Sequence, residues 1–553
     1  MLGLWAFFGV FLFYPICFMV KSAFVSDGVP TLAFVRTLFH DPRLSASLLN
    51  SLKLGIITTL LTFLISMPLA WLMVRCNFTG KGLLSSLLLL PLVLPPFVGA
   101  IGLRQILARY GAVNQLLDTL GIVPLTSGID WLAGGLGCVV VLQTLHLYPI
   151  MFLQLSAALA NVDRSLEEAG QSLGSHGFRL FRTITLPLML PGVFAGASLI
   201  FIWAFTDLGT PLIFDYQQVI PVQIFNQVEN AAENPTGYAM VMFVLVVTAI
   251  LFWTSKWWFE RRRVETTPRS HVGERTRQLN GWQSNLAWFA LGTLLLLAVL
   301  PHLTVIIMSI GKGWQMRIMP KEFTSDFFEA LHTHELTLPS IRNSIFYAGL
   351  ATGLNVILGL AIAYLLARRN IPGRALLDAT AMLPLALPGI VMAFGYIGCF
   401  SGTWLYPRPP HHNPTLLLII SYSVRRLPYV VRACYAGFQQ VSVTLEEASA
   451  SLGAPPLRTL LKVTFPLIAA NILAGGILCF AFSVLEVSDS LVLAQTVEFY
   501  PVTKAIWVLG QRITGDGAHI ASALGVICMI MLGLALFGAF KILGRRMGDL
   551  FRV

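Results

Sequence analysis

Charged residues are scarce in this chain. Asp, Glu, Lys and Arg make up 11% of the 553 residues, whereas hydrophobic residues make up 56%, and the mean hydropathy is +0.75. A water-soluble protein of this size needs more polar surface, because large exposed apolar areas cause aggregation. The composition therefore excludes a soluble protein and indicates one whose solvent is lipid.

Several chemical sites are also missing. The seven cysteines are scattered and none forms a Cys-x-x-Cys pair, so neither a disulfide framework nor a thiolate metal site is expected. No G-x-x-x-x-G-K-[ST] segment occurs, so the chain cannot hold ATP phosphates by that route. No nucleophile–base pair is evident either. We predict a protein that is not an enzyme and that has no catalytic residues, no cofactor and no resident metal.

The excess of basic residues does not indicate nucleic-acid binding. The net charge is +11, but the basic residues lie singly or in short clusters beside apolar stretches, as membrane topology requires. Two groups, His332–His334–Glu335 and His411–His412, have ligand-like spacing. Solvated loop residues explain both groups better than a metal site.

Long apolar runs are the main feature that is present. A bilayer core needs roughly 20 apolar residues per helix, and irregular backbone cannot face lipid. The sequence predicts about twelve spanning helices, near 2–21, 53–74, 83–105, 132–155, 188–212, 237–258, 286–310, 344–366, 376–400, 414–437, 468–495 and 519–541. The first has no basic stretch before it and no small-residue cleavage site after it, so we expect it to be retained.

The basic residues give the orientation. With the N-terminus inside, Arg and Lys concentrate in 75–82, 259–285, 367–375 and 438–467, whereas 213–236 has none. Short cytoplasmic loops carry such an excess. The segments that follow spans four and ten are therefore predicted to be cytoplasmic.

The sequence contains an internal repeat. The segment that starts "NSLKLGIITTLLTFLISMPLAWLMVR" at Asn50 returns as "NSIFYAGLATGLNVILGLAIAYLLAR" at Asn343, which is 293 residues later. A second block, "LEEAGQSLGSHGFRLFRTITLPL" from Leu166, returns at Leu445 as "LEEASASLGAPPLRTLLKVTFPL", with an offset of 279. Both copies of each block have the same orientation, so the repeat is parallel.

The second block predicts a short helix that turns back to the membrane. Asp163 can cap this helix, and acidic residues fill its first turns. Gly174 and Gly453 permit the left-handed conformation that ends a helix. Pro187 and Pro466 can start the next membrane span. Two such helices on the cytoplasmic side would form a symmetric pair of docking elements, and an acidic pair does not suit anionic lipid.

These two blocks resemble the EAA loop of bacterial ABC importer permeases, in which Glu-Ala-Ala is followed by Gly and then by Ile-x-Leu-Pro. The resemblance implies an all-α membrane protein with two parallel-repeated type I permease halves in the bacterial cytoplasmic (inner) membrane. It implies an ABC ATPase subunit dimer on the cytoplasmic face and a periplasmic or extracellular solute-binding protein as partners, besides membrane lipid. Gly170, Ser449 and Phe465 depart from the pattern. The residues to which it assigns ATPase coupling are Glu167, Glu168, Ala169, Gly174, Leu186, Pro187, Glu446, Glu447, Ala448, Gly453, Phe465 and Pro466.

The repeat and the linker predict the domain organisation. The predicted ranges are a first helix and outer loop (1–44), permease domain 1 (45–260), a cytoplasmic linker (261–285), a seventh helix and outer loop (286–334), permease domain 2 (335–545) and a tail (546–553).

Acidic and basic residues within the spans are candidates for the solute pathway. Asp207 and Glu486 hold equivalent positions late in spans five and eleven, and Asp489 follows. They would either line a pathway suited to a cation or lie in headgroup water where the spans end. His146 and Arg425 are also equivalent. Arg425, Arg426 and Arg432 lie low in span ten. They would either serve anion passage or brace the docking loop, or else extend to the membrane interface.

The substrate is less defined than the class. Fusion of two halves in one chain and the phrase "RRLPY" resemble the ferric-iron permease family, which makes ferric iron the first expectation. Its relatives carry 2-aminoethylphosphonate, thiamine or sugar phosphates, and these remain alternatives. An ion-coupled secondary transporter is the alternative of another class. Closure of the ATPase dimer is expected to rock spans five and eleven.

Overall fold

The computed structural model is a helical protein with three short two-stranded sheets. It describes residues 1–26, 28–132, 135–228, 235–261, 277–314, 316–408, 411–512 and 516–543. Two compact units can be distinguished. Unit 1 comprises Met1–Leu44, Pro221–Leu245 and Thr324–Val553, and unit 2 comprises Ser45–Ile220 and Val246–Phe323.

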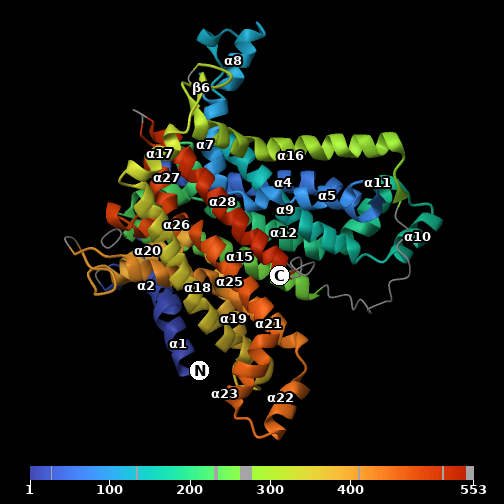
Figure 1. Cartoon of the computed structure of the whole chain (residues 1–553), viewed down its shortest axis with the longest axis vertical. Helices are drawn as coiled ribbons and strands as arrows, with labels where there is room; N and C mark the ends of the chain where they lie inside the picture. The colour runs from blue at the N-terminus through green and yellow to red at the C-terminus, as the bar shows by residue number, and fades with distance from the viewer. Residues whose placement is uncertain are drawn as a thin grey trace. The chain divides into compact units, whose positions relative to one another are not determined.

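Unit 2 contains most of the first repeat (Figure 1). Its helices are α4 (Pro42–Arg75), α5 (Lys81–Leu87), α6 (Leu90–Val93), α7 (Pro96–Leu107), α8 (Ala112–Thr119), η2 (Leu125–Ser127), α9 (Leu136–Ala160), α10 (Arg164–Ser172), α11 (Gly177–Leu180), η3 (Phe181–Thr185), α12 (Leu186–Thr206), α13 (Gly209–Ile213) and α16 (Gly281–Ile310). The helices α14 (Ile220–Asn226) and α15 (Pro235–Arg261) contribute residues to both units. Parallel strands β3 (Cys76–Asn77) and β4 (Arg277–Gln278) and antiparallel strands β5 (Gly311–Lys312) and β6 (Glu322–Phe323) complete it.

Unit 1 contains most of the second repeat and the N-terminal helix. Its helices are α1 (Leu2–Phe8), η1 (Gly9–Phe13), α2 (Tyr14–Phe24), α3 (Ala33–His40), α17 (Asp326–Thr333), α18 (Thr337–Arg368), α19 (Arg374–Met382), η5 (Leu383–Leu385), α20 (Gly389–Phe400), α21 (Thr415–Gln440), α22 (Val443–Ser451), α23 (Pro456–Thr459), η6 (Leu460–Thr464), α24 (Phe465–Leu467), α25 (Ala469–Val484), α26 (Ser488–Leu493), η7 (Val497–Phe499), α27 (Val502–Gly510) and α28 (Gly517–Leu543). Strands β1 (Val25–Ser26) and β2 (Val29–Pro30) pair antiparallel.

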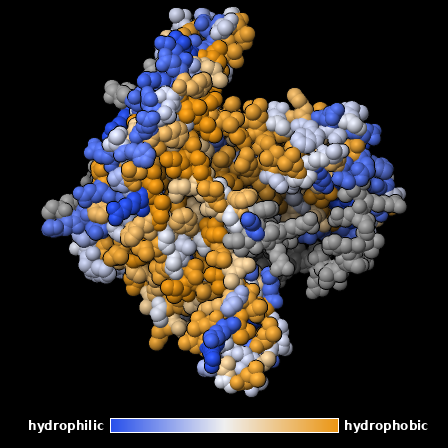
Figure 2. All heavy atoms as spheres, in the orientation of Figure 1, coloured by the Kyte–Doolittle hydropathy of each residue, from blue (hydrophilic) through white to orange (hydrophobic). Residues whose placement is uncertain are grey.

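The helices account for all twelve predicted spans. Within the described ranges, eight helices are long and apolar enough to cross a membrane, and three bent helix pairs raise the number to eleven. The twelfth predicted span corresponds to α21, whose 26 residues include three arginines. Figure 2 shows hydrophobic side chains over long helices such as α18 and α28, as a lipid-facing surface requires. The prediction of an all-α membrane protein is confirmed.

Spans three and nine are bent rather than straight. The helices Lys81–Val93 and Pro96–Thr119 meet at 89°, and Arg374–Leu385 and Gly389–Phe400 meet at 101°. Both bends lie at the repeated phrases "PLVLPP" and "PLALPG". Proline lacks an amide donor and disfavours helix at the residue before it, so each phrase breaks its span at the same place.

Each unit also contains a helix from outside its repeat. In unit 1 the N-terminal helix packs on α20, and the Tyr396 hydroxyl donates a 2.8 Å hydrogen bond to the Phe11 carbonyl. In unit 2, α16 packs on α7, and His302 Nε2 lies 3.1 Å from the Pro95 carbonyl oxygen. The two units are defined by packing, and their boundaries differ from those of the sequence repeats. The predicted domain ranges describe the repeats and stay a prediction.

The predicted linker is described only at its ends. Helix α15 continues to Arg261, and β4 begins at Arg277, where it pairs with β3. Helix α16 starts at Gly281, five residues before the expected start of span seven, because Asn280 and Gln283 form a capping box there. The tail 546–553 lies outside the described residues.

Candidate functional site: the repeated loops and the charged centre

Helices α10 and α22, which we call the loop helices, are built alike. Asp163 accepts a 2.9 Å hydrogen bond from the Ser165 amide at the start of α10, and Ser442 caps α22 by accepting one from Thr444 at 3.3 Å. Such side-chain acceptors satisfy amides that have no partner within the helix. The predicted cap at Asp163 is confirmed.

Both loop helices end in the same reversal. Gly174 and Gly453 have φ angles of 83° and 80°, in the left-handed region that favours glycine. The amides of Gly174 and Ser175 donate back to Gln171 and Gly170, each at 2.9 Å, and Gly453 and Ala454 form the same pair of bonds in α22. This Schellman arrangement ends each helix on hydrogen-bonded carbonyls. The sequence prediction for both glycines is confirmed.

The first glutamate of each pair turns inward. Glu167 Oε2 lies 2.9 Å from Arg75 Nη2 at the end of α4, and the Thr185 hydroxyl donates to Glu167 Oε1 at 2.8 Å. Glu446 repeats the arrangement, with Arg368 Nε at 2.9 Å and the Thr464 hydroxyl at 3.2 Å. All four charged side chains are largely buried. Each loop helix is thereby attached to a long membrane helix, α4 or α18.

The second glutamate of each pair faces outward. Glu168 and Ala169 are exposed, as are Glu447 and Ala448. At the reversals, Leu173 and Leu452 are each 89% exposed. Further large apolar side chains are exposed at positions that match across the repeat: Leu166 with Leu445, and Phe178 with Leu457. Each loop therefore presents an acidic residue together with unburied apolar side chains.

The two loops differ in how they return to the membrane. In the first repeat, α11, η3 and α12 follow one another without a break from Gly177 to Thr206, and Pro187 lies in the first turn of α12, as expected. The wider π-helical turn just before the proline lets the helix continue through it. In the second repeat, Phe465 and Pro466 lie in the three-residue helix α24, which ends at Leu467, and the chain bends by 73° at Ile468 into α25.

The third motif position also differs. A methyl group at Gly170 would overlap the Ile184 side chain and would lie 3.0 Å from Leu180 Cδ1. At the matching position the Ser449 hydroxyl hydrogen-bonds the Thr459 hydroxyl at 2.9 Å. Glycine in one loop and serine in the other therefore follow from the local packing.

The centre of the second repeat contains a buried charge cluster. Glu486 forms ion pairs with both Arg425 and Arg426 of α21, and Asp489 Oδ1 lies 3.6 Å from Arg425 Nη1. The Ser421 hydroxyl donates to Asp489 Oδ2 at 2.7 Å. Glu486 and Asp489 are 4% and 0% exposed. Two arginines thus balance two carboxylates inside unit 1.

This cluster corrects two expectations. Glu486 and Asp489 do not lie in headgroup water, because both carboxylates are buried and paired with arginine. Arg425 and Arg426 do not extend to the membrane interface, since their guanidinium groups bind Glu486. The pairing also means that the acids do not form a free negative lining for a cation. Arg432 differs: it is half exposed and lies 3.4 Å from Asp378.

The centre of the first repeat is weakly charged in comparison. Asp207 is half-buried, accepts a 2.9 Å hydrogen bond from Gln143 Nε2 and accepts another from the Gly209 amide at 3.2 Å. His146, the counterpart of Arg425, lies with Nδ1 2.8 Å from the Pro91 carbonyl oxygen. Thr210 holds the position that corresponds to Asp489. Asp207 and His146 have separate partners, so this centre has no cluster like that around Glu486.

Sequence reasoning missed the partners of three arginines in these sites. Arg75 and Arg368 match in the repeat, but their partners come from the other repeated block, and sequence spacing does not predict that contact. Arg426 was named beside Arg425, but its pairing with Glu486 was not predicted, because Leu147 holds the matching position. For Arg75 and Arg368 a signal was available: each arginine and its glutamate recur in the second half at the offsets of the two repeated blocks, 293 and 279 residues.

The histidines of the outer loops make contacts within the protein. His334 Nδ1 accepts from the Leu336 amide at 3.2 Å, and Nε2 lies 3.2 Å from Arg512 Nη1. Burial and the neighbouring Arg512 lower the pKa of His334. His412 Nδ1 lies 3.1 Å from the Pro407 carbonyl oxygen. Among the described residues, no group of three or more His, Cys, Asp or Glu side chains is arranged to hold a metal ion.

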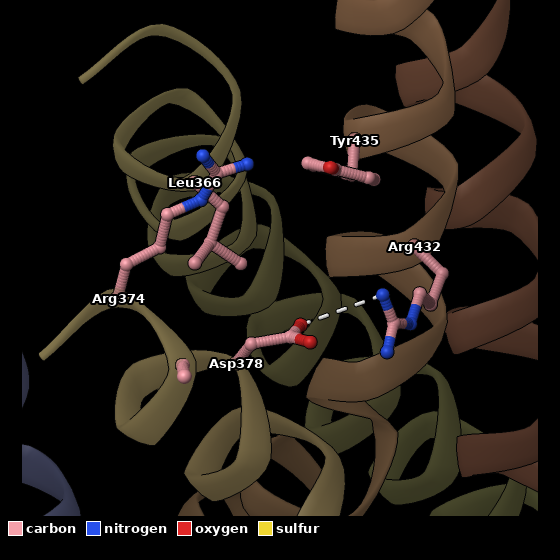
Figure 3. Close-up of a pocket in the computed structure, with 6 residues that line it drawn as sticks. Leu366, Arg374, Asp378, Arg432 and Tyr435 are labelled. Carbon is pink, nitrogen blue, oxygen red and sulfur yellow. Dashed lines mark ion pairs between the residues drawn. The ribbon is translucent and has the colours of Figure 1, made fainter. Parts of the chain in front are cut away.

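A cavity of about 310 Å³ opens beside the inner end of the second repeat (Figure 3). It is lined by Leu366 of α18, by Arg374, Ala375 and Asp378 of α19, and by Arg432 and Tyr435 of α21. The Asp378–Arg432 pair lies across one side of it. Lys81, Ser85 and Leu153 hold the corresponding positions for Arg374, Asp378 and Arg432 in the first repeat, so this charge pattern belongs to one half alone.

Comparison with known proteins agrees with this architecture. The model of the family described as "Binding-protein-dependent transport system inner membrane component" matches residues 55–264 and again 355–549. The ferric transport system permease protein FbpB of Actinobacillus pleuropneumoniae is 27% identical over 504 residues, which cover 89% of this chain and 70% of that protein. A putative ferric transport system permease of Haemophilus influenzae is 28% identical and covers 86% of this chain and 75% of its own length.

Relatives of half the length also match. The molybdenum transport system permease protein ModB of Escherichia coli is 33% identical over 223 residues, which cover 39% of this chain and 93% of ModB. Among solved structures, a bacterial ABC transporter that imports alginate matches 47% of this chain and 92% of its own at 18% identity and a TM-score of 0.38.

The family model covers the greater part of the chain and occurs twice, in the two repeats that contain the loop helices. The match places both copies on helices that are apolar enough to cross a membrane. The chain therefore belongs to the inner membrane components of binding-protein-dependent transport systems, as a fused two-domain ABC importer permease.

Proposed function

We propose that this permease receives its ATPase subunits at the two loop helices, α10 and α22. The supporting observation is that the two glutamates of each Glu-Glu pair have different surroundings. Glu167 and Glu446 are bound to arginines of the chain itself, whereas Glu168 and Glu447 are exposed. The outward glutamate is thus left for a basic residue of a partner.

The surroundings of the outward glutamates support a protein partner rather than lipid. Leu173 and Leu452 are exposed at the reversal that follows each outward glutamate, so each loop offers both an acidic and an apolar contact. Interfaces gain affinity from buried apolar anchors and specificity from charge complementarity. An anionic membrane surface would repel the glutamates. Because the two loops are alike, we expect two copies of one ATPase subunit to bind. The loop residues that would contact them include Ala169, Gly174, Ala448 and Gly453.

Charge reversal tests the docking role. In the double variant Glu168→Arg/Glu447→Arg, like charges would meet, and we expect ATPase co-purification and ATP-driven uptake to fall by more than about tenfold, because mispaired interfacial charges cost several kcal/mol. The matched control is Glu335→Arg, a reversal at an exposed glutamate of an outer loop. Uptake that persists at the wild-type level in the double variant would refute docking at these loops.

We propose ferric iron as the cargo, delivered by a separate periplasmic or extracellular solute-binding protein. Two ferric permeases resemble this chain over most of its length, with both halves in one polypeptide. That shared fused arrangement supports a shared cargo. Asp207, Glu486, Asp489, His146 and Arg425 remain predicted pathway residues, with Glu486 and Asp489 as members of a neutralised cluster and not as a free negative lining.

A tetrahedral oxyanion is the second candidate cargo. Arg425 and Arg426 place two guanidinium groups in the middle of α21, where Glu486 now balances them. An oxyanion would take the place of that carboxylate, because guanidinium groups bind oxyanions in bidentate geometry. The molybdenum permease supports the same class by its identity over one half of the chain. Uptake of radioactive ferric iron and of radioactive molybdate by the complete reconstituted importer separates the two cargoes, and transport of molybdate alone would exclude iron.

A further inference from the structure

A serine at the outer end of each repeat holds the start of another helix. Ser51 of α4 accepts a 2.8 Å hydrogen bond from the Ile220 amide, the first residue of α14. Ser344 of α18 accepts a 2.7 Å bond from the Val502 amide, the first residue of α27. Both bonds are buried. The first amides of a helix have no partner within it, so each serine supplies an acceptor that the outer helix lacks.

The adjacent asparagine strengthens this attachment in the second repeat. Asn343 Nδ2 donates to the carbonyl oxygens of Glu498 at 2.8 Å and Tyr500 at 3.2 Å, just before α27. In the first repeat, Asn50 Nδ2 lies 3.5 Å from Gln218 Oε1. The dipeptide Asn-Ser therefore starts both repeats for a structural reason: it binds the segment in front of an outer helix.

The same long helices hold the loop helices at their other ends. Arg75 lies 24 residues after Ser51, and Arg368 lies 24 residues after Ser344, a helical distance of about 36 Å. Helix α4 is continuous from Pro42 to Arg75 and has Pro68 inside it, and α18 is continuous from Thr337 to Arg368. Each is therefore one continuous helix with a polar contact to a loop helix at one end and to an outer helix at the other.

The outer helices meet one another. The ring of Phe225 in α14 lies 5.7 Å from the ring of Trp507 in α27, edge to face at 85°. Both rings belong to unit 1. Displacement of either helix would change this contact.

We propose that α4 and α18 transmit movement of the loop helices to α14 and α27, with Ser51, Ser344, Arg75 and Arg368 as positioning residues. This inference rests on the proposed docking of ATPase subunits at α10 and α22. A motion imposed on a loop helix is carried through the Arg–Glu pair, along the long helix and through the serine to the first turn of the outer helix.

The alternative route, through the spans that follow the loops, differs between the repeats. Span five continues without a break through Pro187 to Thr206, whereas the second repeat bends by 73° at Ile468. A bent joint transmits an axial displacement poorly. The route through α4 and α18 has the same polar contacts at both ends in the two repeats, so it can move both outer helices together. The rocking of spans five and eleven stays a separate prediction.

Cross-linking between the outer helices tests the proposal without knowledge of the cargo. Phe225→Cys and Trp507→Cys are introduced into a background without native cysteines, and the full permease–ATPase complex is treated with a short thiol cross-linker, with and without ATP and vanadate. We expect nucleotide to change the cross-linking rate about tenfold, within the usual range of allosteric coupling. In the Ser51→Ala/Ser344→Ala background that change should disappear, while ATPase subunits still co-purify.

Two further variants complete the test. Ser51→Thr/Ser344→Thr keeps the hydroxyl acceptors and should restore the response. Thr62→Ala/Ser340→Ala is the matched control, because these hydroxyls bond carbonyls of their own helices, and it should respond like the parent. An unchanged response in the Ser→Ala variant, or no response in the parent complex that has ATPase bound, would overturn the proposal. Failure of the ATPase to co-purify with the parent would instead refute the proposed docking.

Discussion

The two repeats are alike at their ends and unlike in their middle. At the inner end each has an inward glutamate bound to an arginine and an outward glutamate, and at the outer end each has a serine that holds a helix start. In the middle, the second repeat has a cluster of four charged side chains. The corresponding part of the first repeat has Asp207, which is hydrogen-bonded to Gln143. Under the proposed docking, the two inner ends would meet two copies of one ATPase subunit, whereas the middle would meet a single solute.

The differences in the middle are correlated with one another. Gly389 stands where the first repeat has Pro96, and a methyl group there would lie 2.6 Å from the guanidinium carbon of Arg425. Arg425 itself stands where the first repeat has His146. The bulk of the arginine thus requires glycine at the start of α20, and the smaller histidine does not. Gly389 and Arg425 therefore fit together in the second repeat, where Pro96 and His146 stand in the first.

The largest expected effect comes from breaking the charged centre. Glu486→Gln leaves Arg425 and Arg426 without their shared carboxylate, and loss of one partner of a buried pair costs about 3–5 kcal/mol. Asp207→Asn in the first repeat keeps an acceptor for Gln143 and should cost less than about 1 kcal/mol. Thermal unfolding of the two purified variants compares the centres. Equal destabilisation would show that the two centres do not differ energetically.

An intermediate effect is expected at the inner ends, where the repeats should respond alike. Arg75→Ala and Arg368→Ala each remove the cation that holds an inward glutamate, and each should cost about 2 kcal/mol, since a largely buried charged group loses its partner. Limited proteolysis of each loop helix, with unfolding as the second measurement, checks this. A loss in one repeat alone would mean that the ends are not equivalent.

The smallest effect is expected at the third motif position. Ser449→Ala removes one hydrogen bond to the Thr459 hydroxyl and should cost about 0.5–1.5 kcal/mol. The control is Ser451→Ala, because that hydroxyl bonds a carbonyl within its own helix, the Glu447 carbonyl. Chemical unfolding of both variants separates loss of the contact between helices from loss of a hydroxyl. If the two variants are equally stable, the Ser449–Thr459 hydrogen bond does not stabilise the loop.

Much of the fold could be predicted because it follows from patterns among neighbouring residues. Apolar runs of about 20 residues gave eleven of the spans, since lipid excludes other backbone structures. The glycines at 174 and 453 and the cap at Asp163 follow from backbone stereochemistry and a missing acceptor, which are properties of a few neighbouring residues. Bends at Pro95 and Pro388 were not predicted as bends, although their prolines were visible, because an angle depends on what packs around the break.

The candidate site was predicted in part. The sequence by itself determined that two acidic loops of the same design occur in register, because a repeat preserves the residues that make a helix, a cap and a turn. It could not assign roles within each Glu-Glu pair, since only packing decides that Glu167 meets Arg75 and Glu168 meets solvent.

Tertiary structure also decided the state of the charges in the membrane. From sequence, Glu486 and Arg425 were separate candidates for a pathway and an interface. Folding brings together residues 61 positions apart and makes them one neutralised cluster, since a buried charge is stable only beside its counter-charge. Composition and periodicity set which segments lie in lipid, and contacts between distant segments set which charges remain available for function.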